Sequence, residues 1–244
     1  MDAGPHRYFH VDWLPPLLAN TAAGSPPRVL VDLGAGDGAA LHALAAASLL
    51  GEETWAVDLS RERIELCERT VPGVHGLVAD ATAVETLADG SADAVVASQL
   101  IEHLPDDRAL APELARLLRP GGWFYVSSVV RGPHSWWIYR RDGRTVLDPT
   151  HVREYATVED FRAALADPRL ELDAVRSEPL RFPAADLALR ALAFARLLRF
   201  EQLPGLYRRA PALARLRRLR VPVPGYRGSR PSAGAARCSS QIGR

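Results

Sequence analysis

Asp32 and three alternating glycines, Gly34, Gly36 and Gly38, are the residues whose types and spacing best suit ligand chemistry. They end an apolar run that starts at Val29 and is typical of a buried parallel strand. Glycine adopts backbone angles closed to other residues and leaves room for a bulky ligand. The start of the following helix presents unpaired N–H groups. The pattern therefore predicts a binding site for a nucleotide-type cofactor.

Two cofactor classes fit the glycine spacing. Gly34, Gly36 and Ala39 match the G-x-G-x-x-G/A turn of dinucleotide-binding proteins. Asp32 favours S-adenosylmethionine instead, because a carboxylate at the mouth of the strand could hold the cationic amine of that cofactor, directly or through water. The alternative is that Asp32 only caps the end of a strand.

Two histidines, His103 and His151, are the candidates for proton transfer. The unperturbed pKa of imidazole, ~6.5, suits removal of an acceptor proton at neutral pH. His103 follows an apolar run at residues 92–97, and His151 precedes a helix that Thr157 and Asp160 are expected to cap. Each histidine also has a structural alternative, as part of a surface turn for His103 and as a cap for His151.

The elements that must position these residues are strands separated by helical segments. Five apolar runs are predicted as strands, at residues 29–33, 54–57, 76–79, 92–97 and 123–130. Asp58 follows the second run and Asp80 the third. Asp58 lies about 20 residues beyond the glycine turn, the spacing of a ribose-binding acid. Its carboxylate can accept both ribose hydroxyls, and such hydrogen bonds contribute about 1.5–3 kcal/mol each.

In order and spacing, the motifs between residues 28 and 130 resemble those of the class I S-adenosylmethionine-dependent methyltransferases. Glu102-His103-Leu104 resembles the ubiquinone/menaquinone-type small-molecule branch. The resemblance implies an α/β fold, a Rossmann-like, mostly parallel seven-stranded sheet with helices on both faces, plus N-terminal and C-terminal helical cap elements. It also implies an enzyme that uses S-adenosyl-L-methionine to methylate a small organic acceptor at oxygen, nitrogen or an acidic carbon, in natural-product or cofactor biosynthesis.

The resemblance assigns the site residues as well. Those implied to bind the cofactor are Asp32, Gly34, Gly36, Asp58, Leu59, Asp80, Ala81 and Gln99. The catalytic candidates are His103 and His151, the latter because a His-x-x-x-aromatic segment recurs at this place in related small-molecule methyltransferases. No metal is expected, since His6 and His10 have helical spacing but no third ligand nearby.

Two other functions stay open at this point. One is a same-fold enzyme that uses the cofactor for cyclisation or intramolecular alkylation, and the other is a non-catalytic cofactor-binding or scaffold protein. A nucleic-acid acceptor is disfavoured, because residues 98–101 lack the Pro-Pro-aromatic loop of amino-methylating DNA enzymes and neither cysteine follows a proline. The chain has no lysine, which excludes a P-loop lysine and a Schiff-base site.

Charge divides the chain into two parts. Residues 1–180 carry 16 Arg and 27 acidic residues, net −11, whereas residues 181–244 carry 14 Arg and 2 acidic residues, net +12. The basic end could pack on the acidic part, or it could contact an anionic membrane surface as a peripheral partner.

The expected organisation has four parts. They are an N-terminal cap at residues 1–20, a cofactor-binding domain at 28–180, an arginine-rich helical extension at 181–226 and a disordered tail at 227–244. The sixth strand is predicted at residues 170–175 and the seventh within 220–226, because residues 227–232 make a poor strand. No signal segment or uninterrupted apolar stretch of about 18 residues is visible, so a cytoplasmic location is expected.

Overall fold

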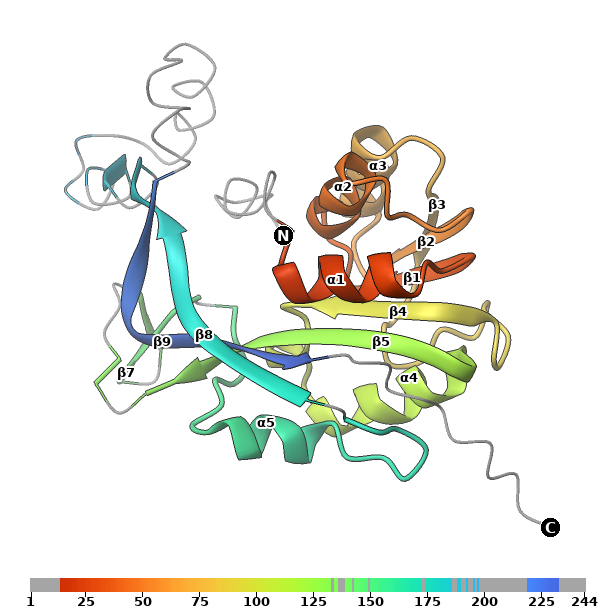
Figure 1. Ribbon diagram of the computed structural model, residues 1–244. Helices are drawn as coiled ribbons and strands as arrows, with labels where there is room; N and C mark the ends of the chain where they lie inside the picture. The colour runs from red at the N-terminus through yellow and green to blue at the C-terminus, as the bar shows by residue number, and fades with distance from the viewer. Residues whose placement is uncertain are drawn as a thin grey trace.

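The computed structural model describes residues 14–132, 134–135, 139–141, 143–148, 150–172, 174–185, 188–189, 192, 195, 197 and 219–232. Seven strands form one sheet in the order β3-β2-β1-β4-β5-β9-β8, and β6 and β7 form a separate pair. Figure 1 shows α1, α2 and α3 on one side of the sheet and α4 and α5 on the other. The predicted α/β, Rossmann-like, seven-stranded architecture with helices on both faces is confirmed.

The first five strands of the sheet are parallel and lie close to where the sequence places them. They are β1 (Val29–Leu33), β2 (Glu53–Asp58), β3 (His75–Val78), β4 (Ala92–Ser98) and β5 (Leu118–Arg131). Side chains of β4 alternate between two cores: Val95 and Ala97 pack on one face of the sheet, and Ala94 and Val96 on the other. A strand that is buried on both faces has mostly apolar side chains, which is why the sequence alone predicts β4.

Within the described residues, five helices cover the two faces. They are α1 (Pro16–Gly24), α2 (Ala39–Ala46) and α3 (Arg61–Thr70) on one face, and α4 (Leu110–Leu117) and α5 (Val158–Ala164) on the other. Thr157 and Asp160 form the reciprocal capping box that their spacing predicts for α5. The indole Nε1 of Trp123 donates to the carbonyl of Ser25 at 2.9 Å, which fastens the end of α1 to the sheet.

The N-terminal cap is seen only in part. Of the segment expected at residues 1–20, residues 1–13 lie outside the described part of the chain. The remainder contributes the start of α1, which continues to Gly24.

Two long antiparallel strands, β8 (Ala174–Pro183) and β9 (Arg220–Ser232), complete the sheet. The sixth strand is thus β8, and the prediction of residues 170–175 is wrong. Residues 227–232, expected to belong to a disordered tail, are the second half of β9. The expected helical extension at 181–226 is strand at both ends. The reason is pairing: β9 lies between β5 and β8, so its backbone is hydrogen-bonded on two sides despite a sequence of low strand propensity.

A small hairpin and two short turns complete the described elements. The hairpin consists of β6 (Tyr139–Arg141) and β7 (Arg144–Val146), and the 3₁₀ turns η2 (Ile101–His103) and η3 (Asp107–Ala109) follow β4. No helix in the described ranges is both long enough and apolar enough to cross a membrane.

Candidate cofactor and acceptor site

The glycine turn lies at the carboxyl end of β1, against the segment that follows β4. The φ angles of Gly34 and Gly36 are +69° and +57°, in the left-handed region that favours glycine. A Cβ at Gly34 would lie 2.6 Å from Cδ1 of Leu100. Because β1 pairs in parallel with both β2 and β4, the carboxyl ends of three strands meet here, which is where open α/β sheets bind ligands.

Asp32 is buried at this end of β1, and only 1% of its surface is exposed. Its Oδ2 has no hydrogen-bond partner among the described residues. Burial, with a smaller contribution from Asp58, raises the pKa of Asp32 from 3.8 to about 8. Leaving a buried polar atom unsatisfied costs about 1–3 kcal/mol, and a cationic ligand group beside this carboxyl would offset that cost.

Asp58 connects the end of β2 to the glycine turn. Its Oδ2 accepts the N–H of Gly36 at 3.0 Å, and its Oδ1 accepts the N–H of Ser60 at 2.9 Å. Each carboxylate oxygen has a second lone pair, so both can still accept a ligand hydroxyl. The next residue, Leu59, is 73% exposed, and Val78 at the end of β3 is 40% exposed. Two apolar side chains therefore lie open to solvent beside a fixed carboxylate.

Asp80, Ala81 and Gln99 lie at the same end of the sheet, just after the carboxyl ends of β3 and β4. Oδ1 of Asp80 accepts the backbone N–H and the hydroxyl of Thr82, at 2.8 and 2.7 Å, and Ala81 is buried. Gln99 has a φ of +56°, unusual for a residue other than glycine. Its N–H donates to the carbonyl of Ser127 at 2.9 Å and its side-chain amide to the hydroxyl of Ser127 at 3.3 Å, which orients the turn after β4.

Glu102, His103 and His151 come together beyond the end of β4. Glu102 is fully buried; its Oε2 accepts the hydroxyl of Ser128 at 2.9 Å, and its Oε1 has no hydrogen-bond partner within the described ranges. The backbone carbonyl of Glu102 accepts the N–H groups of Val152 and Arg153, so the loop carrying His151 is held against η2. The ring centroids of His103 and His151 lie 4.9 Å apart, edge to face.

Glu154 and Tyr226 support His151 from behind. Nδ1 of His151 lies 3.0 Å from Oε1 of Glu154, and the hydroxyl of Tyr226, on β9, donates to Oε2 of Glu154 at 3.3 Å. Burial alone would lower the pKa of His151, but the hydrogen bond to Glu154 and the charges of Glu102 and Asp148 outweigh it, and the pKa is raised. Burial raises the pKa of Glu102 to about 7, although His151 opposes this shift.

These supporting residues are the ones that sequence reasoning missed. Glu154 lies within the segment that contains His151, but its role depends on a contact with Tyr226 across 72 positions of the chain. Tyr226 belongs to β9, where the sequence predicts at most the end of a short strand. The one available signal was the acid three residues after a histidine, a spacing that lets both side chains meet.

Glu102, His103 and His151 are also the residues here that could hold a metal. Each offers one ligand atom, and the three atoms lie within 4.8 Å of one another. The expectation of no metal site rests on His6 and His10 alone. Those two residues lie outside the described part of the chain.

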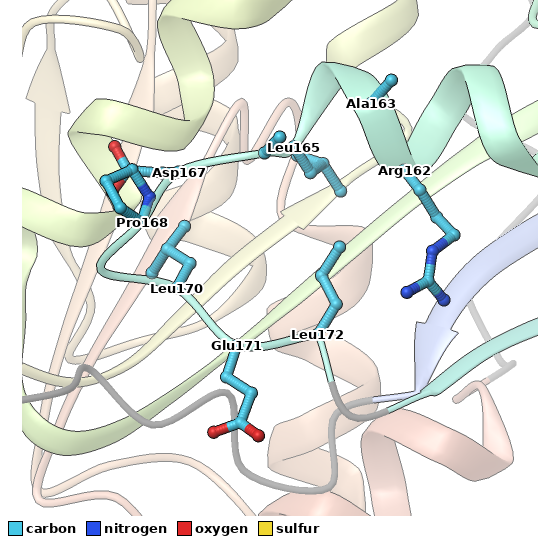
Figure 2. A pocket seen from close by; sticks show the side chains of 9 residues that line it. Arg162, Ala163, Leu165, Asp167, Pro168, Leu170, Glu171 and Leu172 are labelled. Atoms are coloured by element: carbon cyan, nitrogen blue, oxygen red, sulfur yellow. The ribbon is translucent and has the colours of Figure 1, made fainter.

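A surface hollow of about 640 Å³ lies elsewhere, along α5 and the residues that follow it, 162–172. Figure 2 shows Leu170 and Leu172 pointing toward Leu165, and Glu171 pointing away from them. Leu165 belongs to the core under the sheet, and Leu170 and Leu172 pack against it. The hollow contains none of the predicted site residues.

Comparison with known sequences matches the central part of the chain. Residues 31–126 fit the family model described as Methyltransferase domain. A ubiquinone biosynthesis O-methyltransferase of Xanthomonas oryzae pv. oryzae is 36% identical over 115 residues, which are 43% of this chain and 44% of that protein. The enzyme of the same name from Bordetella avium is 29% identical over 136 residues, 52% of each chain. The chain thus spans about half the length of the curated relatives it matches.

Solved structures share the fold over a longer stretch. The YcgJ protein of Bacillus subtilis has a TM-score of 0.55 and 23% identity, covering 71% of this chain and 75% of that one. A geranyl diphosphate methyltransferase in complex with S-adenosylmethionine has a TM-score of 0.58 and 18% identity, covering 91% and 83%. His151, Glu154 and Tyr226 lie outside the residues that the family model matches.

Proposed function

We propose that this chain, which belongs to the class I S-adenosylmethionine-dependent methyltransferases through its domain at residues 31–126, transfers a methyl group from S-adenosylmethionine to a small organic acceptor. The observation that carries the proposal is the buried Asp32 carboxyl beside the glycine turn and Asp58, with one oxygen that no described residue hydrogen-bonds. A cofactor that brings a cationic amine and a ribose diol fits both carboxylates. Relatives named ubiquinone biosynthesis O-methyltransferase, and a fold shared with a geranyl diphosphate methyltransferase, support a small acceptor.

On the cofactor side, each residue has a separate task. Asp32 would hold the amine, the backbone at Gly34 and Gly36 would lie along the cofactor, and Asp58 would accept the ribose hydroxyls. The remaining residues assigned to the adenine end and to the turn after β4 are Leu59, Asp80, Ala81 and Gln99. The exposure of Leu59 and Val78 supports this assignment, since an adenine ring would cover apolar surface that is otherwise open to solvent.

On the acceptor side, the task is mostly positioning. The sulfonium methyl is already activated, and an acceptor lone pair displaces S-adenosylhomocysteine in line. Holding the two reactants together can supply about 7–11 kcal/mol of the barrier. His103 and His151 would assist the loss of a proton from an acceptor hydroxyl, amine or acidic carbon. Their place beyond β4, next to the turn at Gln99, supports this role.

Calorimetry tests the cofactor assignment. S-adenosylmethionine should bind and NAD should not, and Asp58→Asn should weaken binding at least tenfold, because hydrogen bonds to a charged group contribute about 1.5–3 kcal/mol each. Glu85→Gln, a change of an exposed acid on the same chain, is the control. Tight binding of NAD alone would contradict the proposal.

Methyl-labelled cofactor tests the reaction. Incubation with a small-molecule extract should yield S-adenosylhomocysteine and metabolites that gain one labelled methyl group. If methylthioadenosine forms and keeps the label while no other metabolite carries it, the aminobutyrate part of the cofactor has reacted instead, and the enzyme performs cyclisation or intramolecular alkylation. If the cofactor binds and is never consumed, a scaffold role is favoured.

We also infer a peripheral contact between the arginine-rich C-terminal part and an anionic membrane surface. Arg181 on β8 and Arg227 on β9 are exposed, and residues 181–244 have a net charge of +12. Each basic residue near such a surface contributes about 1 kcal/mol. The contact would bring the site close to apolar acceptors.

A further inference from the structure

The cluster of Glu102, His103 and His151 has the composition of a metal centre. Two imidazoles and one carboxylate each offer a ligand atom, and the three atoms lie within 4.8 Å of one another. Two of the residues follow β4 in η2, and the third comes from the loop before α5, held by hydrogen bonds from Val152 and Arg153 to the carbonyl of Glu102. The ligand atoms therefore come from two segments that the backbone fixes to each other.

A second observation points to a ligand at this place. Glu102 is fully buried, and while its Oε2 accepts the hydroxyl of Ser128, its Oε1 has no hydrogen-bond partner among the described residues. A carboxylate needs acceptor contacts on both oxygens to compensate for its loss of water, and an unsatisfied one is costly. A bound cation would satisfy the second oxygen.

The surroundings of the histidines fit the same interpretation. Nδ1 of His151 lies 3.0 Å from Oε1 of Glu154, and Nδ1 of His103 lies 3.3 Å from the carbonyl oxygen of Thr150. Histidines that bind a metal usually donate their second ring N–H to a carboxylate or a backbone carbonyl, which fixes the ring and the tautomer. In that arrangement Nε2 of each ring is the ligand atom. Tyr226 and the N–H of Leu147 in turn hold Glu154.

We propose that Glu102, His103 and His151 bind a divalent transition metal such as zinc. Two nitrogen ligands and one oxygen ligand suit zinc, iron or cobalt better than magnesium or calcium, which prefer oxygen ligands throughout. Three protein ligands leave coordination positions open. If the methyl transfer proposed above holds, an acceptor oxygen would occupy one of them and lose its proton more readily on the metal; this role, unlike the metal site itself, rests on the proposed function.

Metal binding is measured without any acceptor. We expect the full-length, tag-free protein, stripped with a chelator, to bind one equivalent of cobalt(II) with visible d–d absorption, and zinc to displace it. Glu102→Gln, His103→Ala and His151→Ala should each weaken binding at least tenfold. Glu154→Gln should weaken it by about 10- to 100-fold, the usual effect of losing a residue that orients a ligand. His75→Ala, which changes an exposed histidine on β3, should bind like the unchanged protein.

Three results would overturn the proposal: no cobalt or zinc bound by the unchanged protein, a cobalt spectrum that lacks nitrogen ligation, or unchanged affinity in all three ligand variants. The first two results are measured on the unchanged protein alone. The proposal can therefore still be refuted if Glu102→Gln fails to fold. Calorimetry with S-adenosylmethionine on the same samples separates the two ideas. Cofactor binding without metal binding refutes the metal site alone, and metal binding without cofactor binding refutes the proposed methyl transfer alone.

Discussion

At the scale of single residues, the fold changes the acid–base behaviour of Asp32 strongly. Burial raises its pKa from 3.8 to about 8, so between about pH 4 and pH 8 the folded protein keeps a proton that the unfolded chain has released. Because the folded state binds more protons in this range, its stability falls as the pH rises toward 8. The unfavourable ionised form is the one that a cationic ligand would stabilise.

The variant Asp32→Asn should lose this part of the pH dependence, since an amide does not ionise. We expect the free energy of unfolding of the variant, relative to the unchanged protein, to increase by about 1.4 kcal/mol for each pH unit between pH 5 and pH 8 and to level off above that. Urea denaturation at a series of pH values measures it. A constant difference at all pH values would mean that Asp32 ionises normally in the fold.

Gly34 and Gly73 form a matched pair for the glycine turn. Both have a left-handed φ, +69° and +90°, but a Cβ at Gly34 would lie 2.6 Å from Leu100, whereas a Cβ at Gly73 would meet nothing within 4 Å. Gly73→Ala should therefore cost only the conformational strain, about 1–2 kcal/mol. Gly34→Ala should cost more and should also weaken cofactor binding. Equal losses of thermal stability in the two variants would show that the contact with Leu100 is unimportant.

At the scale of elements, β9 joins the edge strand β8 to the rest of the sheet and carries Tyr226 to Glu154. A chain that ends after Ser232 keeps β9 and should melt like the full chain in circular dichroism. A chain that ends after Leu219 lacks β9, so β5 and β8 lose their shared partner and should expose unpaired edges. We expect this shorter chain to aggregate or to unfold without cooperativity. Cooperative unfolding at an unchanged temperature would show that β9 contributes little.

The strands also show what local sequence can and cannot predict. β1 and β4 can be predicted locally because a strand buried on both faces is apolar over most of its length. β3 lies at the edge of the sheet and is partly exposed, so Asp80 beyond its end is predicted from the order of the motifs and not from burial. The Thr157–Asp160 capping box can be predicted because its two residues are three positions apart. β9 cannot be predicted from its own sequence, because Pro222, Gly225 and Arg227 are typical of a loop. They form a strand only through pairing with distant strands. The link between Tyr226 and Glu154 depends on that same pairing.

At the scale of the whole molecule, the division of charge predicts binding to anionic surfaces. The protein should sediment with phosphatidylglycerol vesicles at low salt and be released as salt shortens the screening length to about 8 Å at 0.15 M and about 3 Å at 1 M. Arg181→Ser combined with Arg227→Ser should reduce binding severalfold. Arg61→Ser combined with Arg69→Ser, two exposed arginines of α3, is the control of equal charge. Equal binding by both double variants, or none by the unchanged protein, would argue against the contact.

The position of β9 in the chain also has a consequence for synthesis on the ribosome. The glycine turn, Asp58 and Asp80 are complete once β5 has been made, but β5 has its outer neighbour only when residues 226–229 emerge. Until then, the nascent chain presents an unpaired strand edge, which is the kind of surface that misfolds or recruits chaperones. Glu154 likewise has no hydrogen bond from Tyr226 until β9 has been synthesised. A ribosome stalled near residue 200 should therefore carry a chain that can already bind its cofactor but in which the support behind His151 is not yet built.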